Sequence, residues 1–248
     1  MKAIILSGGL GTRLRPLTCT TPKTLLPLLN RPFLEYQLDL LKKYNVKEVT
    51  FCLNYRPQIF KKYFTQLQIT DYRLQINYVV EKEPLGTGGA IKNALCGKKI
   101  KEKVIVLNGD VLTDIDLGKG ISFHQKNKAK VTITLTPVED PRLYGLVEID
   151  DSGKIKNFRE KPSLPLTTYL INAGVYLFEP EILDYIPEGI NYSLERSLFP
   201  LLLQKRLPLY GYIYNGYWLD IGTVEKYLQA NFDLMEQKVK GVRLKVKS

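Results

Sequence analysis

The sequence is poor in the residues that build disulfide frameworks, zinc sites and histidine-based catalysis. It has 3 cysteines and 1 histidine in 248 residues. The cysteines are odd in number and lack paired ligand spacing, so they indicate neither disulfides nor zinc and favour a reducing compartment. The single histidine, His124, lies in an amphipathic stretch where a structural role is expected, and no Ser-centred elbow motif is present. A hydrolytic triad therefore has little support.

Long hydrophobic runs are also lacking. The apolar run at residues 3–6 is too short for a signal-peptide core, and no later stretch approaches the roughly 20 residues needed to span a bilayer. We therefore expect a cytoplasmic protein with no membrane partner.

Positive charge is in excess: 36 Lys+Arg against 25 Asp+Glu gives a net charge of +11. This balance favours encounters with anionic partners without choosing among nucleotides, sugar phosphates and nucleic acid. The lysines occur in short clusters that flank apolar segments, as at solvated helix ends, and we find neither an aromatic-rich strand motif nor a basic helix spaced for a groove. No nucleic-acid partner is expected. The alternative, a nucleic-acid-binding module, would require tight, salt-dependent binding to oligonucleotides.

Apolar β-rich runs alternate with amphipathic stretches through the first half of the chain, which predicts βαβ units around a mostly parallel sheet. These segments are 3–6, 33–43, 49–53, 59–64, 74–80, 90–95 and 104–107. The second half is richer in strands, at 131–136, 144–149, 155–158, 170–178 and 208–214, with helical patterns at 194–204 and 224–237. We predict one α/β domain over residues 1–232 and a basic C-terminal extension over 233–248.

A glycine-rich segment follows the first apolar run. Residues 8–14 read Gly-Gly-Leu-Gly-Thr-Arg-Leu, and Lys23 follows nine residues later. Glycine lets backbone N–H groups approach phosphate oxygens, and Arg13 and Lys23 add fixed positive charge, so an anion site is favoured over a plain turn. A Rossmann fingerprint would need glycine in place of Leu14, and a Walker loop would need Gly-Lys-Ser/Thr, which the sequence lacks.

A second glycine-bearing segment, residues 81–89, lies between an expected strand and an expected helix. A ligand could lie there against the helix N-terminus, although a tight strand-to-helix turn explains the same residues.

Two distant aspartates are candidate metal ligands. Asp110 follows the apolar run 104–107, at the strand end where ligands bind in open α/β sheets, and Asp220 lies within Trp-Leu-Asp-Ile-Gly-Thr. Mg²⁺ is often held by one or two carboxylates plus substrate phosphates, but spacing alone does not establish that these two meet, and each alone is equally consistent with a cap or turn. Asp114 and Asp116 are weaker rivals, Asp116 because it precedes an expected helix as a cap.

Taken together and in order, these segments resemble the sugar-nucleotide pyrophosphorylase family, the sugar-1-phosphate nucleotidylyltransferases, over residues 1 to about 232. The resemblance rests on residues 8–18, Pro22-Lys23, residues 84–87, Asn108-Gly109-Asp110, Tyr144-Gly145, Glu160-Lys161-Pro162, Asn172-Ala173-Gly174 and residues 218–223.

The resemblance implies a Rossmann-like nucleotidyltransferase fold, with a mixed, mostly parallel sheet flanked by helices and no C-terminal left-handed β-helix. It implies Mg²⁺ as cofactor and a nucleoside triphosphate and a sugar 1-phosphate as partners, and it leaves open whether the chain forms a homo-oligomer. Arg13, Lys23, Asp110, Lys161 and Asp220 would be the catalytic residues, Asp110 and Asp220 holding the metal. The nucleotide would contact Leu6, Gly8, Gly9, Gly11, Thr12, Glu81, Pro84, Gly86 and Thr87, and the sugar would contact Gly145, Glu160 and Asn172.

Mannose-1-phosphate and manno-heptose-1-phosphate guanylyltransferases resemble the chain most, in residues 81–86 and 193–200. A carboxylate at Glu81 can accept hydrogen bonds from guanine N1–H and the 2-amino group, a donor pair that uracil and thymine lack. GTP and mannose 1-phosphate are therefore the favoured substrates. The alternatives are thymidylyl or uridylyl transfer to glucose 1-phosphate, guanylyl transfer to manno-heptose 1-phosphate, and a non-catalytic nucleotide-binding regulatory subunit.

Overall fold

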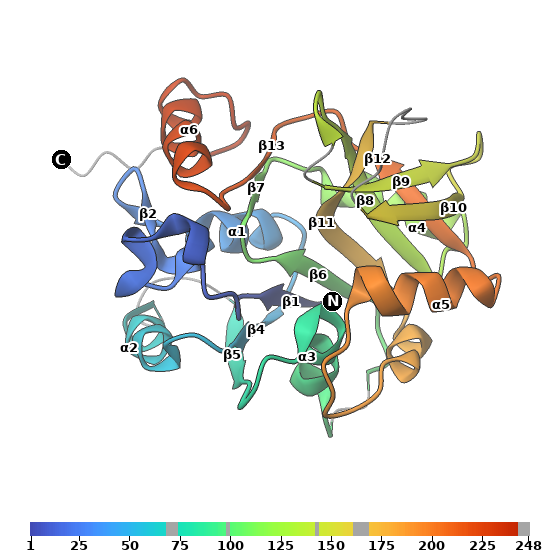
Figure 1. The fold of residues 1–248 in the computed structure, drawn as a ribbon, viewed down its shortest axis with the longest axis horizontal. Helices are drawn as coiled ribbons and strands as arrows, with labels where there is room; N and C mark the ends of the chain where they lie inside the picture. The colour runs from blue at the N-terminus through green and yellow to red at the C-terminus, as the bar shows by residue number, and fades with distance from the viewer. Residues whose placement is uncertain (68–73, 98–99, 142–143, 161–168, 243–248) are drawn as a thin grey trace.

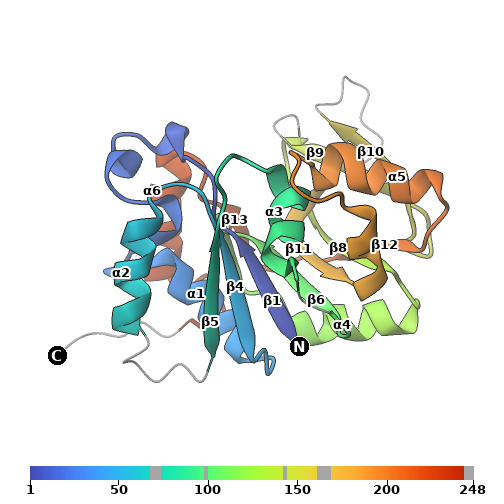
Figure 2. The ribbon, with the colours of Figure 1, turned by 90° about the horizontal axis from the view of Figure 1, so that it is seen from below.

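In the computed structural model, the described residues are 1–67, 74–97, 100–141, 144–160 and 169–242. Within them, nine strands form one mixed sheet with helices on both faces (Figures 1 and 2). The strands of this sheet are β1 (Lys2–Leu6), β4 (Glu48–Leu53), β5 (Gln75–Val80), β6 (Val104–Asn108), β8 (Val131–Pro137), β9 (Gly145–Ile149), β10 (Ile155–Glu160), β11 (Leu170–Phe178) and β12 (Leu209–Ile213). The prediction of a mixed sheet flanked by helices is confirmed.

The sheet changes character at β11. Strands β5, β4, β1 and β6 are neighbours in that order and run parallel, as the alternating pattern of the first half predicts. Strand β11 then pairs antiparallel with β6, β8 and β9, and β12 pairs parallel with β8. Strands β9 and β10 form an antiparallel hairpin at the far edge. The first half of the chain therefore supplies the parallel part of the sheet.

The helices cover the two faces of the sheet unequally. Figure 2 shows α1 and α2 on one side of β1, β4 and β5, with α3 on the other side. Alternate residues of β1 point to each face: Ile5 packs in the cluster with Phe51 and Phe60, and Ile4 packs in the cluster with Ile91. The helices are α1 (Phe33–Lys42), α2 (Pro57–Leu67), α3 (Gly86–Leu95), α4 (Leu117–Lys126), α5 (Phe199–Gln204) and α6 (Val224–Met235).

Two small sheets lie beside the main one. Strand β7 (Val111–Thr113) pairs antiparallel with β13 (Trp218–Asp220), and β2 (Pro27–Leu28) pairs with β3 (Arg31–Pro32). Short helical turns η1 (Thr12–Leu14), η2 (Leu17–Cys19), η3 (Lys23–Leu25) and η5 (Pro180–Tyr185) connect the longer elements. The β7–β13 pair is the connection that matters for the site, because it joins segments about one hundred residues apart.

The sequence-based boundaries hold for most elements. The predicted helix over residues 194–204 is a π-helical turn, η6 (Leu194–Leu198), that continues into α5. The sequence pattern did not indicate the short strands β2, β3, β7 and β13. Residues 243–248 of the predicted C-terminal extension lie outside the described residues. The boundary after residue 232 falls within α6, and the separate C-terminal extension stays a prediction.

None of the helices in the described ranges is long and apolar enough to cross a membrane.

Candidate active site

A pocket of about 330 Å³ opens at the carboxyl ends of β1 and β6 and at the start of α3. This is where open α/β sheets bind ligands, since the chain leaves the sheet there on both sides. Nine residues proposed from the sequence line the pocket: Leu6, Gly8, Gly9, Lys23, Glu81, Pro84, Gly86, Thr87 and Asp110.

The glycine-rich segment after β1 divides into an open part and a constrained part. A side chain added at Gly9 would meet no atom within 4 Å, so the backbone there is open to a ligand. Gly11 has a φ of 62° and accepts a hydrogen bond from the Thr18 hydroxyl at 2.7 Å, which gives it a structural role in the turn. Gly11, Thr12 and Arg13 lie outside the pocket lining.

Glu81 is buried at the pocket wall, with 7% of its surface exposed. Its Oε2 accepts a hydrogen bond from the Leu85 backbone N–H at 3.0 Å, and its Oε1 lies 3.4 Å from where a Cβ on Gly8 would stand. Burial raises the pKa of Glu81 above its usual value, although the bond from Leu85 opposes that shift. One carboxylate oxygen therefore holds the loop, and the other lies next to Gly8 of the glycine-rich segment.

The start of α3 is less open than the sequence implies. The N–H groups of Gly88 and Gly89 both donate to the Tyr192 carbonyl, at 2.8 and 3.0 Å. The Thr87 hydroxyl accepts from Leu194 N–H at 2.8 Å and donates to Glu195 at 3.1 Å. These donors are occupied within the protein, so a contact of Thr87 with nucleotide stays a prediction.

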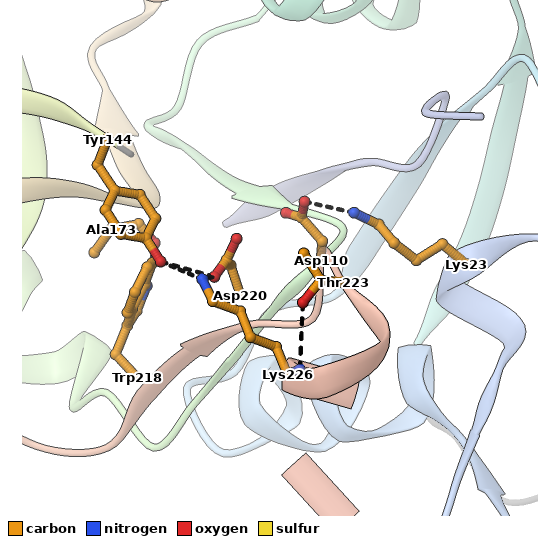
Figure 3. Close-up of polar contacts among 8 residues, drawn as sticks. All are labelled: Lys23, Asp110, Tyr144, Ala173, Trp218, Asp220, Thr223 and Lys226. Atoms are coloured by element: carbon orange, nitrogen blue, oxygen red, sulfur yellow. Dashed lines mark hydrogen bonds and ion pairs between the residues drawn. The ribbon is translucent and has the colours of Figure 1, made fainter. Parts of the chain in front are cut away.

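Asp110 and Asp220 come from segments that the fold joins. In the β7–β13 ladder Asp220 is the partner of Val111, and the Ile221 N–H donates to the Asp110 carbonyl at 2.8 Å. Lys23 Nζ lies 2.6 Å from Asp110 Oδ2 (Figure 3). The sequence spacing could not show whether these two segments meet, and the ladder shows that they do. Asp110 lines the pocket, and Asp220 lies on the neighbouring segment.

Asp220 has its own cationic partner. Lys226 Nζ contacts Asp220 Oδ1 and the Tyr144 hydroxyl, and Tyr144 donates to the same Asp220 oxygen at 3.1 Å (Figure 3). Burial alone would lower the pKa of Lys226, but the hydrogen bonds to Asp220 and Tyr144 outweigh it and leave that pKa raised. For Tyr144 burial acts in the opposite direction and raises the pKa, because the charged form of tyrosine is the deprotonated one.

Arg13 is exposed and lies on the Asp220 side of the site. A Cβ built on Gly222 would stand 3.0 Å from Arg13 Nη2 and 3.2 Å from Asp220 Oδ2. The guanidinium and this carboxylate therefore border the same small space. Glycine at position 222 leaves room for both side chains.

The residues proposed for the sugar site are partly described. Gly145 is exposed at the start of β9. The Asn172 amide donates to the Tyr176 hydroxyl at 3.0 Å and accepts from Gly174 N–H at 3.0 Å, so it is held within β11. Glu160 ends β10, and its side chain is not described. Lys161 lies outside the described residues.

The rival residues have structural roles. Asp114 accepts backbone hydrogen bonds from Tyr217 and Lys240, each at 2.9 Å. Asp116 caps α4 by accepting from Lys119 N–H at 3.0 Å, as predicted. His124 is buried, with its ring nitrogens 2.8 Å from Thr132 Oγ1 and 3.2 Å from Glu179 Oε1, which confirms the structural assignment.

Sequence reasoning missed several polar groups at the pocket. Buried side-chain oxygens of Ser7, Thr24 and Asn108 line it and have no hydrogen-bond partner within the described part of the chain. Ser7 precedes the glycine-rich segment, and Asn108 belongs to the Asn108-Gly109-Asp110 motif, so the sequence does contain a signal for both. Lys226 had no such signal, because an isolated lysine on a helix is ordinary.

The two aspartates fit a divalent cation. No cluster of three or more His, Cys, Asp or Glu occurs in the described ranges, so the candidate donors are the two carboxylates alone. Mg²⁺ takes oxygen ligands and is usually bound by one or two carboxylates plus substrate phosphates. Each carboxylate here already holds an ammonium group as a stand-in cation. The donor set therefore suits a metal ion that arrives with a phosphorylated substrate.

The fold and the pocket define an α/β protein with a pocket at the carboxyl ends of its parallel strands. The family model for nucleotidyl transferases matches residues 2–237, and the chain belongs to this family.

Similar proteins fall in the same family. The chain is 42% identical to mannose-1-phosphate guanylyltransferase of Mycobacterium tuberculosis over 94% of its own length and 64% of that protein's. It is 37% identical to UTP--glucose-1-phosphate uridylyltransferase of Synechocystis, over 98% of the chain and 66% of that protein. The chain thus spans just under two thirds of these relatives. HddC from Yersinia pseudotuberculosis is similar in structure, with a TM-score of 0.79 and 29% identity over 94% of this chain and 99% of that one.

Proposed function

We propose that this chain is an enzyme that transfers a nucleotidyl group from a nucleoside triphosphate to a sugar 1-phosphate and releases pyrophosphate. The observation that carries the proposal is the pairing of the segments that bear Asp110 and Asp220, next to a pocket that Asp110 and Glu81 both line. A pocket of about 330 Å³ suits a small ligand. Family membership supports the same reaction class.

The favoured nucleotide is GTP, and the favoured sugar phosphate is mannose 1-phosphate. The mycobacterial guanylyltransferase supports both, and HddC has been solved in complex with GMP-PN. The Synechocystis relative keeps UTP with glucose 1-phosphate as a second candidate pair. Guanyl transfer to manno-heptose 1-phosphate is a further alternative within the same chemistry.

The proposed chemistry is in-line attack of a sugar-phosphate oxygen on the α-phosphorus. That oxygen is ionised at neutral pH, so no general base is needed, and catalysis consists of positioning and charge neutralisation. Lys23 and Arg13 would hold the phosphates, and Lys161 would hold the sugar phosphate. Gly145, Glu160 and Asn172 would contact the sugar. Asp110 and Asp220 would hold Mg²⁺, which when bound neutralises phosphate charge.

The direct test measures pyrophosphate release from GTP, UTP and dTTP, each with mannose 1-phosphate, glucose 1-phosphate and manno-heptose 1-phosphate, with and without Mg²⁺. Release that requires both substrates and the metal supports the proposal, and the best pair identifies the substrates. Nucleotide binding without turnover with any pair would instead indicate a regulatory subunit. Tight, salt-dependent oligonucleotide binding would contradict the expectation of no nucleic-acid partner.

A further inference from the structure

Lys226 is anchored to two side chains of the candidate site. It lies in the first turn of α6, whose N-cap Thr223 accepts a hydrogen bond from the Lys226 backbone N–H. Its Nζ contacts both Asp220 Oδ1 and the Tyr144 hydroxyl (Figure 3). The ammonium therefore contacts one oxygen, Oδ1, of the carboxylate that would bind a metal.

This contact differs from the ion pairs on the surface of the protein. The Lys226 and Asp220 side chains are 27% and 18% exposed, against 39% and 50% for the pair of Lys130 with Glu181. Lys226 also lies 4.8 Å from the centre of the Tyr144 ring, where the face of the aromatic ring attracts a cation. Screening by water is weaker for such a pair, so its electrostatic effect is larger than that of an exposed pair.

We propose that Lys226 is the internal counter-ion of Asp220, and that its positive charge opposes a divalent cation at this carboxylate, so that Lys226 lowers the metal affinity of the free protein. The inference rests on the proposed function only in taking Asp220 as a metal ligand. Lys226 acts through Asp220 and is a positioning residue. Tyr144 supports this arrangement by contacting both partners from a different part of the chain.

A positive charge beside a carboxylate opposes the binding of any second cation to that carboxylate. Because the side chains are partly exposed, water screens part of this effect. Removing the ammonium should tighten metal binding by roughly tenfold to a hundredfold.

The test is a titration of the free chain with Mn²⁺ alone, followed by the electron paramagnetic resonance signal of unbound Mn²⁺ at fixed pH and salt. The variants are Lys226→Met, Lys226→Arg, Asp220→Asn and Lys130→Met, and thermal melts check that each is folded. Lys226→Gln replaces Lys226→Met if the latter does not fold. We expect tighter binding for Lys226→Met, wild-type binding for Lys226→Arg and Lys130→Met, and weaker binding for Asp220→Asn.

The outcomes separate the two proposals. If Lys226→Met binds Mn²⁺ no more tightly than wild type while Asp220→Asn binds it less tightly, Asp220 remains a metal ligand and the counter-ion role is wrong. Tighter binding in Lys226→Arg as well would also contradict that role, because the positive charge is retained there. If Asp220→Asn binds like wild type, the inference is overturned, and pyrophosphate release then decides the proposed reaction independently.

Discussion

Glu81 offers the sharpest test of base recognition, because its two carboxylate oxygens have different surroundings. Oε2 accepts from Leu85 N–H at 3.0 Å, and Oε1 lies next to Gly8 of the glycine-rich segment. In Glu81→Gln, the amide oxygen can keep the bond from Leu85. The amide NH₂ then turns toward the pocket and meets the donor edge of guanine. We therefore expect the variant to lose preference for GTP while the loop keeps its shape.

The magnitude follows from leaving a buried donor unpaired, which costs about 1 to 3 kcal/mol. At 1.4 kcal/mol per factor of ten, this corresponds to roughly a fivefold to 150-fold loss in the ratio of kcat/KM for GTP over UTP. Overall activity with the best nucleotide should fall less than this ratio does, because Glu81 contacts neither the phosphates nor the sugar in the proposed arrangement.

Competition kinetics with GTP and UTP measure the ratio directly. Glu83→Gln is the matched control, since Glu83 is exposed on the same loop and should keep the wild-type ratio. An unchanged ratio in Glu81→Gln, or a wild type that uses UTP or dTTP best, would refute base recognition by Glu81.

The pKa of Glu81 adds a pH dependence. Burial raises that pKa, so the side chain takes up a proton at a higher pH than an exposed glutamate does. The neutral acid presents fewer acceptors to guanine, and preference for GTP should decline as pH falls through the raised pKa. In Glu81→Gln the ratio should not change with pH.

Further variants separate activity from stability. Asp110→Asn should reduce activity by a factor on the order of 10² to 10³ with little change in melting temperature, because Asp110 lines the pocket. A comparable loss of activity and of thermal stability would instead indicate a structural aspartate. Gly109→Ala would place a Cβ 2.4 Å from the Leu6 carbonyl oxygen and should destabilise by about 1 to 3 kcal/mol, whereas Gly9→Ala should melt like wild type and lose nucleotide affinity. Burial lowers the pKa of His124, so at low pH the unfolded chain binds a proton more readily than the folded chain does. The melting temperature should therefore fall as pH drops below about 6.5. In His124→Gln this part of the pH dependence should be lost.

The parallel part of the sheet could be predicted from the sequence, because buried parallel strands are continuous apolar runs and the helices between them are amphipathic. The run at residues 104–107 also located the end of β6, and with it Asp110. Strands β7 and β13 have 3 residues each, too few for periodicity to separate them from loops. The sequence also could not predict that the N–H groups at the start of α3 are already hydrogen-bonded within the protein. Their acceptor is the carbonyl of Tyr192, which is about a hundred residues away and is not marked by any sequence pattern.

The β7–β13 pair explains how two aspartates that the sequence alone could not bring together lie on neighbouring segments. An antiparallel ladder fixes which residues are opposite one another, and a slip of one residue turns every side chain to the other face. Opposite Val111, Asp220 has a fixed place beside Asp110, and the turn after β13 leads directly into α6, where the cap at Thr223 sets the position of Lys226. The same three-residue strand also carries Trp218, whose indole N–H donates to the Ala173 carbonyl at 2.8 Å and ties β13 to β11. Asp220 therefore lies on a short strand that pairs with β7 and is tied to β11, and Lys226 follows on the helix that this strand leads into. We expect a change in the β13 register to displace both charges together.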